Sequence, residues 1–172
     1  DTLLDDFVLS LRIVMRGYTI AYCADAYAVE NGSADMHEEE KRKVRIAAGG
    51  LQSVWRLRAL LNPLRYGVFS FQYISHRVLR WSVTPVALFL LFPLNILLVV
   101  CSESLPVYFL FLLLQSAFYL GGVYGSLLSA KSVKNKFLYI PYYFLFMNIN
   151  VIKGFFYLKR HAGGTWEKSR RA

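Results

Sequence analysis

The segment WSVTPVALFLLFPLNILLVVCS, residues 81–102, decides what kind of fold this sequence can form. Its 22 residues carry no charge, and about 20 apolar residues in a helix are enough to cross the hydrocarbon core of a bilayer. A second uncharged run of 27 residues, 104–130, follows directly after Glu103. The two runs predict a transmembrane hairpin with helices at about 82–102 and 106–129, joined by a very short connection.

Composition and charge also favour a membrane protein. The chain has 172 residues, of which 56% are hydrophobic, more than in a typical soluble domain. Nine of its 11 acidic residues lie in 1–40, whereas 18 of its 20 Lys and Arg residues lie in 41–172. Basic residues flank the hairpin on both sides, which predicts that both of its ends are cytoplasmic. Such a basic chain can bind nucleic acid or an anionic membrane. Because of the long apolar runs we expect a lipid bilayer and no nucleic acid.

The zone 41–81 predicts basic amphipathic helices that lie in the membrane interface. It contains nine Lys or Arg residues and no acid. Pro63 and Gly67 predict a break into two helices. An apolar stripe at helical spacing predicts which side chains enter the headgroup layer: Phe71, Ile74, Val78 and Trp81.

A third apolar segment, 137–158, is long enough to span a bilayer but is interrupted by polar residues and helix breakers. Among these are Pro141, Asn148 and Lys153. We expect a re-entrant or broken element, and a plain spanning helix remains the alternative. Residues 159–172 are expected to form a cytoplasmic tail.

The polar start of the chain, residues 1–40, reads as the end of a soluble α/β domain. Thr2 and Asp5 fit a capping box, and Gly17 fits a helix end. The segments YTIAY (18–22) and AYAV (26–29) predict short strands. The fold class expected is therefore α/β followed by membrane α-helices.

Cysteine and histidine give no sign of a metal site. Neither Cys23 nor Cys101 has the spacing of a metal ligand, and they predict no disulfide framework. The three histidines are isolated from one another, so surface or interfacial roles are expected for them: His37, His76 and His161.

Five segments of the sequence, in this order, resemble one family. DDFVLSLRIVMRGY (5–18) resembles the segment that closes the catalytic domain of membrane-bound family 2 glycosyltransferases, the relatives of cellulose, hyaluronan and poly-N-acetylglucosamine synthases. AYAVENG (26–32), with Glu30, resembles the family's next strand and acidic loop. KRKVRIAAGGLQSVWRL (41–57) resembles the basic helix that follows, and SHRVLRW (75–81) and TWEKSRR (165–171) resemble the juxtamembrane segment and the tail.

The resemblance implies a fold and a place in a longer protein. Residues 1–40 would be the C-terminal end of a Rossmann-like GT-A domain. The chain would be a C-terminal fragment that lacks the donor-binding half and is inactive by itself. We expect an integral protein of the bacterial inner membrane with its catalytic side in the cytoplasm.

The activity implied is transfer of a sugar, with inversion, from a nucleotide sugar to a glycan or lipid-linked acceptor. Asp6 would be the general base and Asp5 would support it. The alternative is that both acids only favour the positive end of a helix dipole. A divalent cation, Mg²⁺ or Mn²⁺, is implied by the resemblance alone, with ligands outside this segment.

The resemblance also suggests residues that bind the diphosphate or the substrate. In the family's Gln-x-x-Arg-Trp motif, Arg45 keeps the arginine, whereas Arg42 and Ile46 replace the glutamine and the tryptophan. Ile46 cannot stack on an acceptor sugar, so transfer of single sugars or short chains is favoured over long polymers. Arg42 and Arg45 would bind the diphosphate, unless they bind lipid headgroups. Trp166 and Lys168 are further candidates, and Trp166 could equally be an interfacial anchor.

A second class of function fits part of the sequence. A non-enzymatic channel or transporter-like module would explain the apolar hairpin and its basic flank. It would leave DDFVLSLRIVMRGY unexplained, so we favour the transferase.

Overall fold

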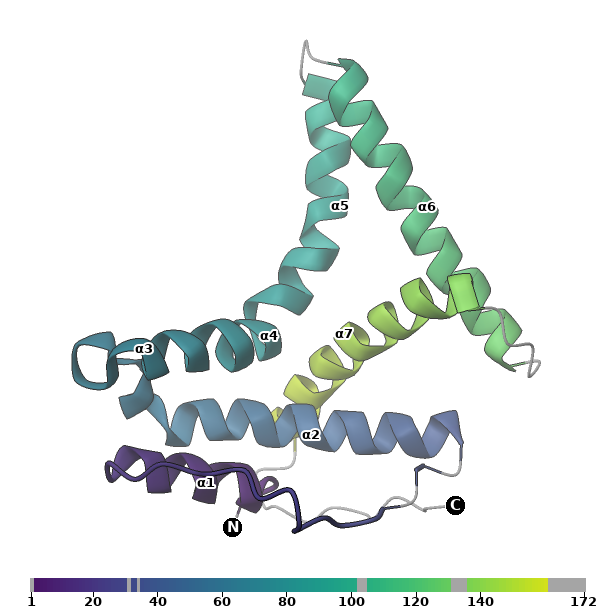
Figure 1. The fold of residues 1–172 in the computed structure, drawn as a ribbon. Coiled ribbons are helices and arrows are strands. Elements are labelled where there is room, and N and C mark those ends of the chain that lie inside the picture. Colours follow the sequence, from purple (N-terminus) through teal and green to yellow (C-terminus); the bar gives the residue numbers. More distant parts are fainter. Residues whose placement is uncertain (1, 31, 34, 102–104, 131–135, 161–172) are drawn as a thin grey trace. The chain divides into compact units, whose positions relative to one another are not determined.

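The computed structural model of the protein describes residues 2–30, 32–33, 35–101, 105–130 and 136–160. This part of the chain is all-α, and an irregular segment joins α1 (Asp5–Met15) to α2 (Met36–Arg56) (Figure 1). It contains no strand and no Rossmann-like α/β part. The expected α/β fold class, with a GT-A end in residues 1–40, is therefore wrong.

The two expected strands do not form, because no described residue pairs with them. Residues 18–22 and 26–29 are irregular and fully exposed, with Tyr22 93% and Val29 88% accessible. Their β-branched and aromatic residues favour extended backbone. An extended segment without a neighbouring strand gains no ladder hydrogen bonds and no packing, however. β-propensity alone is therefore not enough to predict a strand in these segments.

The chain divides into two compact units. Unit 1 consists of the described residues up to Val83 and from Asn150 onward, and unit 2 consists of 84–149. Each unit is described by itself below.

Unit 1 begins with α1 (Asp5–Met15), whose end follows the sequence prediction. Gly17 adopts a φ of 88°, and its N–H donates to Val14 O at 2.9 Å. Tyr18 N–H donates to Ile13 O, which completes a Schellman motif. The expected capping box does not form, because Leu4 is the N-cap and Thr2 Oγ1 donates to the side chain of Asp5.

The central helix of unit 1 is α2 (Met36–Arg56). Asp35 caps it by accepting a hydrogen bond of 2.8 Å from Glu38 N–H. A 3₁₀ turn, η1 (Arg58–Leu61), follows, and α3 (Pro63–Tyr73) starts with Pro63 in its first turn. Gly67 kinks α3 with a φ of 54°. The predicted breaks at Pro63 and Gly67 are both confirmed.

The predicted apolar stripe is wrong at its C-terminal end. A π-helix, η2 (Ile74–Val78), separates α3 from the short α4 (Leu79–Trp81). A π-turn widens the helix, so residues beyond it no longer continue the face expected from a period of 3.6. Phe71 is 69% exposed, whereas Trp81 is only 7% exposed and packs inside unit 1.

The core of unit 1 joins α1 to the segments that follow α2. Val8 packs with Leu57, Leu60 and Tyr73, which are all buried. Ser70, also buried, donates a hydrogen bond of 2.6 Å to Leu60 O. Because burial removes water from the Tyr73 hydroxyl, it raises the pKa of that group to about 12.

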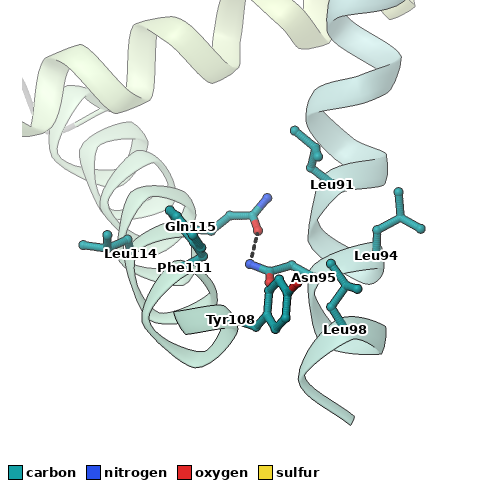
Figure 2. A pocket seen from close by; sticks show the side chains of 8 residues that line it. All are labelled: Leu91, Leu94, Asn95, Leu98, Tyr108, Phe111, Leu114 and Gln115. Atoms are coloured by element: carbon teal, nitrogen blue, oxygen red, sulfur yellow. Dashed lines mark hydrogen bonds between the residues drawn. The ribbon is translucent and has the colours of Figure 1, made fainter. Parts of the chain in front are cut away.

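Unit 2 contains most of the two helices that are long and apolar enough to cross a membrane: α5 (Val83–Cys101) and α6 (Leu105–Ala130). They coincide with the ranges expected for the hairpin. Tyr119 donates a hydrogen bond of 2.6 Å to Leu88 O, and its ring contacts Phe89 and Phe92. Asn95 donates to Gln115 Oε1 at 3.2 Å, which adds a second polar link between the helices (Figure 2).

The last described helix, α7 (Lys136–Arg160), runs without a break although Pro141 lies inside it. In unit 2 its first half packs on glycines of α6. A Cβ atom on Gly125 would lie 2.5 Å from Leu138 O, so the backbones approach closely, as small residues allow between membrane helices. In unit 1, Gly154 packs on Ala47 and Ala48 of α2.

Candidate functional site: the start of α1 and its seat on α2

The two carboxylates singled out by the sequence lie in the first turn of α1. The side chains of Asp5 and Asp6 are exposed. Ser10 Oγ donates a hydrogen bond of 2.8 Å to the backbone O of Asp6, one turn along the helix. Asp6 thus presents its carboxylate to solvent at the positive end of the helix dipole, where an anion is favoured.

The chain just before Asp5 is held by the middle of α2. A Cβ atom on Gly49 would lie 2.7 Å from Leu4 Cγ and 2.9 Å from Leu3 Cβ, so only glycine permits this approach. Leu3 N–H also donates to Gln52 Oε1 at 3.3 Å. These contacts of Leu3 and Leu4 fix where α1 begins and therefore where Asp5 and Asp6 lie.

An aromatic cluster holds the residue next to Asp6. The ring of Phe7 meets Trp81 edge to face, with centroids 5.5 Å apart. The Trp81 indole lies on Gly50, where a Cβ atom would be 2.5 Å from Cδ2 of the ring. The guanidinium of Arg77 lies 5.2 Å from the Phe7 centroid and 5.7 Å from that of Trp81, which adds cation–π attraction.

Arg42 is engaged by a carboxylate of its own helix. Its Nε and Nη2 each donate a hydrogen bond of 3.0 Å to Glu39. Burial by itself would raise the pKa of Glu39, but the hydrogen bonds from Arg42 and Ser33 and the charge of Lys43 outweigh it and lower this pKa to about 2. Glu39 is therefore an anion that already neutralises the most obvious cation for a diphosphate.

Arg45 lies one turn further along α2 and is different. Its Nε is buried and has no hydrogen-bond partner within the described residues. A buried donor without an acceptor costs free energy, so this guanidinium would gain from a ligand that supplies an oxygen. Asp6 and Arg45 belong to the same unit, but no hydrogen bond or ion pair joins them in the part of the chain described.

The structure does not place the remaining predicted site residues. Trp166 and Lys168 lie outside the described residues. Among those described, no three His, Cys, Asp or Glu side chains gather in a way that could hold a metal ion.

An open cavity in unit 2 has a different character. It measures about 420 Å³ and lies between α5 and α6 (Figure 2). Leucines and aromatic rings make up most of its wall, and its polar side chains include the bonded amides of Asn95 and Gln115. None of the described residues that line it is charged.

Sequence reasoning missed the residues that hold α1. Phe7, Arg77 and Trp81 were not recognised as a cluster, because Trp81 was assigned to the headgroup layer. The sequence feature that could have indicated this packing was the Gly49–Gly50 pair inside a helix. Two adjacent glycines weaken a helix unless another segment needs the space.

Comparisons of the chain with protein-family models, curated proteins and solved structures find no match. The functional argument therefore rests on the motifs and on the geometry of unit 1.

Proposed function

We propose that this chain belongs to an inverting glycosyltransferase that acts at a membrane surface, with Asp6 as the general base. The observation that carries the proposal is the exposed Asp6 carboxylate at the start of a helix that Gly49 and the Phe7–Trp81 contact hold in place. A general base must be both accessible to the acceptor and fixed in position. The order of the five sequence segments that resemble the family adds support.

The reaction proposed is a single in-line displacement. The acceptor hydroxyl oxygen forms a bond to the anomeric carbon of a nucleotide sugar while the bond from that carbon to the diphosphate oxygen breaks. The hydroxyl proton passes to the Asp6 carboxylate, and the nucleoside diphosphate leaves with the bonding electron pair. Asp5, whose side chain accepts a hydrogen bond from Thr2 Oγ1, supports the first turn of α1, which carries Asp6.

Arg45 is our candidate for the contact with the departing diphosphate. A fixed cation that meets developing negative charge stabilises the transition state. Its buried Nε without a partner in the described region supports this role, whereas the bidentate contact of Arg42 with Glu39 disfavours Arg42. The location proposed is the bacterial inner membrane, with unit 1 on the cytoplasmic side.

The test compares two substitutions that remove the same chemical group. Membranes that contain the full-length protein are incubated with radiolabelled UDP-glucose or UDP-N-acetylglucosamine, and label in lipid and polymer is counted. We expect Asp6→Asn to lose roughly 10²- to 10⁴-fold in transfer, the usual contribution of a general base. Asp25→Asn, at another exposed aspartate, should keep wild-type transfer. Equal transfer by both variants would remove Asp6 from the base role.

A further inference from the structure

Two amide side chains lie between the apolar helices α5 and α6, and we name Asn95 and Gln115 the amide pair. Asn95 Nδ2 donates a hydrogen bond of 3.2 Å to Gln115 Oε1 (Figure 2). The Asn95 carbonyl oxygen and the Gln115 NH₂ group have no hydrogen-bond partner among the described residues. Both side chains are only half-buried, so these two free groups are accessible at the surface of unit 2.

The amide pair lies far from both ends of α5. At a rise of 1.5 Å per residue, Asn95 is about 9 Å along the helix axis from Cys101 and about 18 Å from Val83. The hydrocarbon core of a bilayer is about 30 Å thick, so if α5 spans, the amide pair lies at the depth of the acyl chains. Acyl chains offer neither a donor nor an acceptor, and a polar group left unpaired among them costs free energy. A partner that supplies both a donor and an acceptor would therefore stabilise the pair.

The cavity of about 420 Å³ beside the amide pair gives such a partner room. Leu91 and Leu94 of α5 and Phe111 and Leu114 of α6 line it, and each is more than 50% exposed. An acyl chain would fill this apolar space but would leave the free amide groups unpaired. A helix surface that carries both leucine and amide side chains would fill the space and pair with the amides.

We propose that the amide pair and this cavity form the contact between two copies of the chain in the membrane. The amide pair is self-complementary, because each copy has one free acceptor, Asn95 Oδ1, and one free donor group, Gln115 Nε2. Across a twofold axis, the donor of each copy meets the acceptor of the other, and hydrogen bonds of this kind hold spanning helices together. The inference goes beyond the sugar-transfer proposal and uses neither Asp6 nor Arg45.

The experiment crosslinks single cysteines in the full-length protein. Cys23 and Cys101 are first replaced by serine and alanine, and then Leu98→Cys or Val100→Cys is introduced. Leu98 lines the cavity, whereas Val100, close to it along α5 and 77% exposed, is not among the described residues that do. Each variant is reconstituted in phosphatidylcholine vesicles over a range of protein-to-lipid ratios and treated with a short bis-maleimide.

We expect Leu98→Cys to give a covalent dimer whose yield follows a dimerisation equilibrium as the protein is diluted in lipid, and Val100→Cys to give little. In the Leu98→Cys background, Asn95→Leu and Gln115→Leu should each raise the dissociation constant of the dimer roughly tenfold, about the effect of an amide hydrogen bond between spanning helices. Ser116→Ala is the matched control, because it removes a polar group next to Gln115 that is not among the described residues lining the cavity. It should leave the dissociation constant unchanged, and circular dichroism checks that every variant keeps its helix content.

Four results would overturn the proposal. Equal crosslinking of Leu98→Cys and Val100→Cys would indicate random collisions. Quenching of a bimane label at position 98 by brominated lipid, without a covalent dimer, would assign the cavity to an acyl chain. Neither a dimer nor quenching would mean that another segment of the full-length chain covers the cavity. An undiminished dimer in both Asn95→Leu and Gln115→Leu would exclude the amide pair from the contact.

Discussion

At the scale of single residues, Trp81 can pack closely on α2 because Gly50 has no side chain. A methyl group there would overlap the indole, since the nearest ring atom lies 2.5 Å from the Cβ position. Trp81 contacts Phe7, the neighbour of Asp6. One missing methyl group therefore affects the position of the proposed base through two aromatic rings.

Gly50→Ala should destabilise the protein although alanine is the better helix former. Helix propensity favours alanine by about 0.5–1 kcal/mol, but overpacking costs about 1–3 kcal/mol. We expect a net loss in the free energy of unfolding, measured by thermal unfolding of the detergent-purified full-length protein. Gly32→Ala is the control, because no atom lies within 4 Å of its Cβ position. A Gly50→Ala variant as stable as Gly32→Ala would mean that Trp81 does not pack on Gly50.

At the scale of elements, the sequence predicted helices well where one local signal was sufficient. The uncharged runs predicted α5 and α6, Gly17 predicted the end of α1, and Pro63 predicted the start of α3. The prediction of strands at 18–22 and 26–29 was wrong, because a strand needs a neighbouring strand, which β-propensity does not reveal.

The candidate site was predictable only in part, for a similar reason. The motif indicated Asp6 as a candidate base. The sequence did not indicate the residues that hold Asp6 in position. The π-helix at Ile74–Val78 shifts the helix face on which Trp81 lies, and no pattern in the sequence predicted this π-helix. Glu39 and Arg42 are three residues apart, a spacing that allows two side chains to pair on a helix. Acidic residues were counted only within 41–81, so Glu39 was left out.

The first turns of α2 should lose stability in acid. The pKa of Glu39 is about 2 in the folded protein, below its ordinary value of 4.5. Its stabilising contribution is therefore complete above pH 4.5 and is lost as the pH falls toward 2. Because Arg42 is partly exposed, we expect about 1–2 kcal/mol after screening.

Thermal unfolding of the wild type and of Glu39→Gln between pH 7 and pH 3 checks this expectation. The variant should be less stable at pH 7 and should change less on acidification. Asp25→Asn, which removes an exposed carboxylate elsewhere, should follow the wild type. Parallel pH curves for the wild type and Glu39→Gln would contradict the account of this ion pair.

The packing of α6 on α7 depends on some of its glycines more than on others. Gly125→Ala would place a methyl group 2.5 Å from Leu138 O, a backbone atom that cannot move by itself. At Gly121 the nearest atom, Pro141 Cγ, lies at 3.7 Å, which is ordinary contact. We expect Gly125→Ala to lower the free energy of unfolding in detergent by about 1–3 kcal/mol and Gly121→Ala to leave it nearly unchanged. The opposite order would rule out this close approach.

At the scale of the whole molecule, chemistry and apolar surface are divided between the two units. Unit 1 carries Asp5 and Asp6 and the basic helix α2. Unit 2 consists mostly of apolar helices, and none of the described residues that line its cavity is charged. The proposed base and the two helices apolar enough to cross a membrane thus belong for the most part to different units.

The most direct test of the central claim separates kcat from KM for Asp6→Asn. A base that acts only in the transition state contributes to kcat and leaves ground-state binding of the donor unchanged. With full-length protein in membranes and the nucleotide sugar that the wild type uses, we predict that kcat falls roughly 10²- to 10⁴-fold. The KM for the donor should stay near its wild-type value. A wild-type kcat, or a loss confined to KM, would contradict the assignment of Asp6 as the general base.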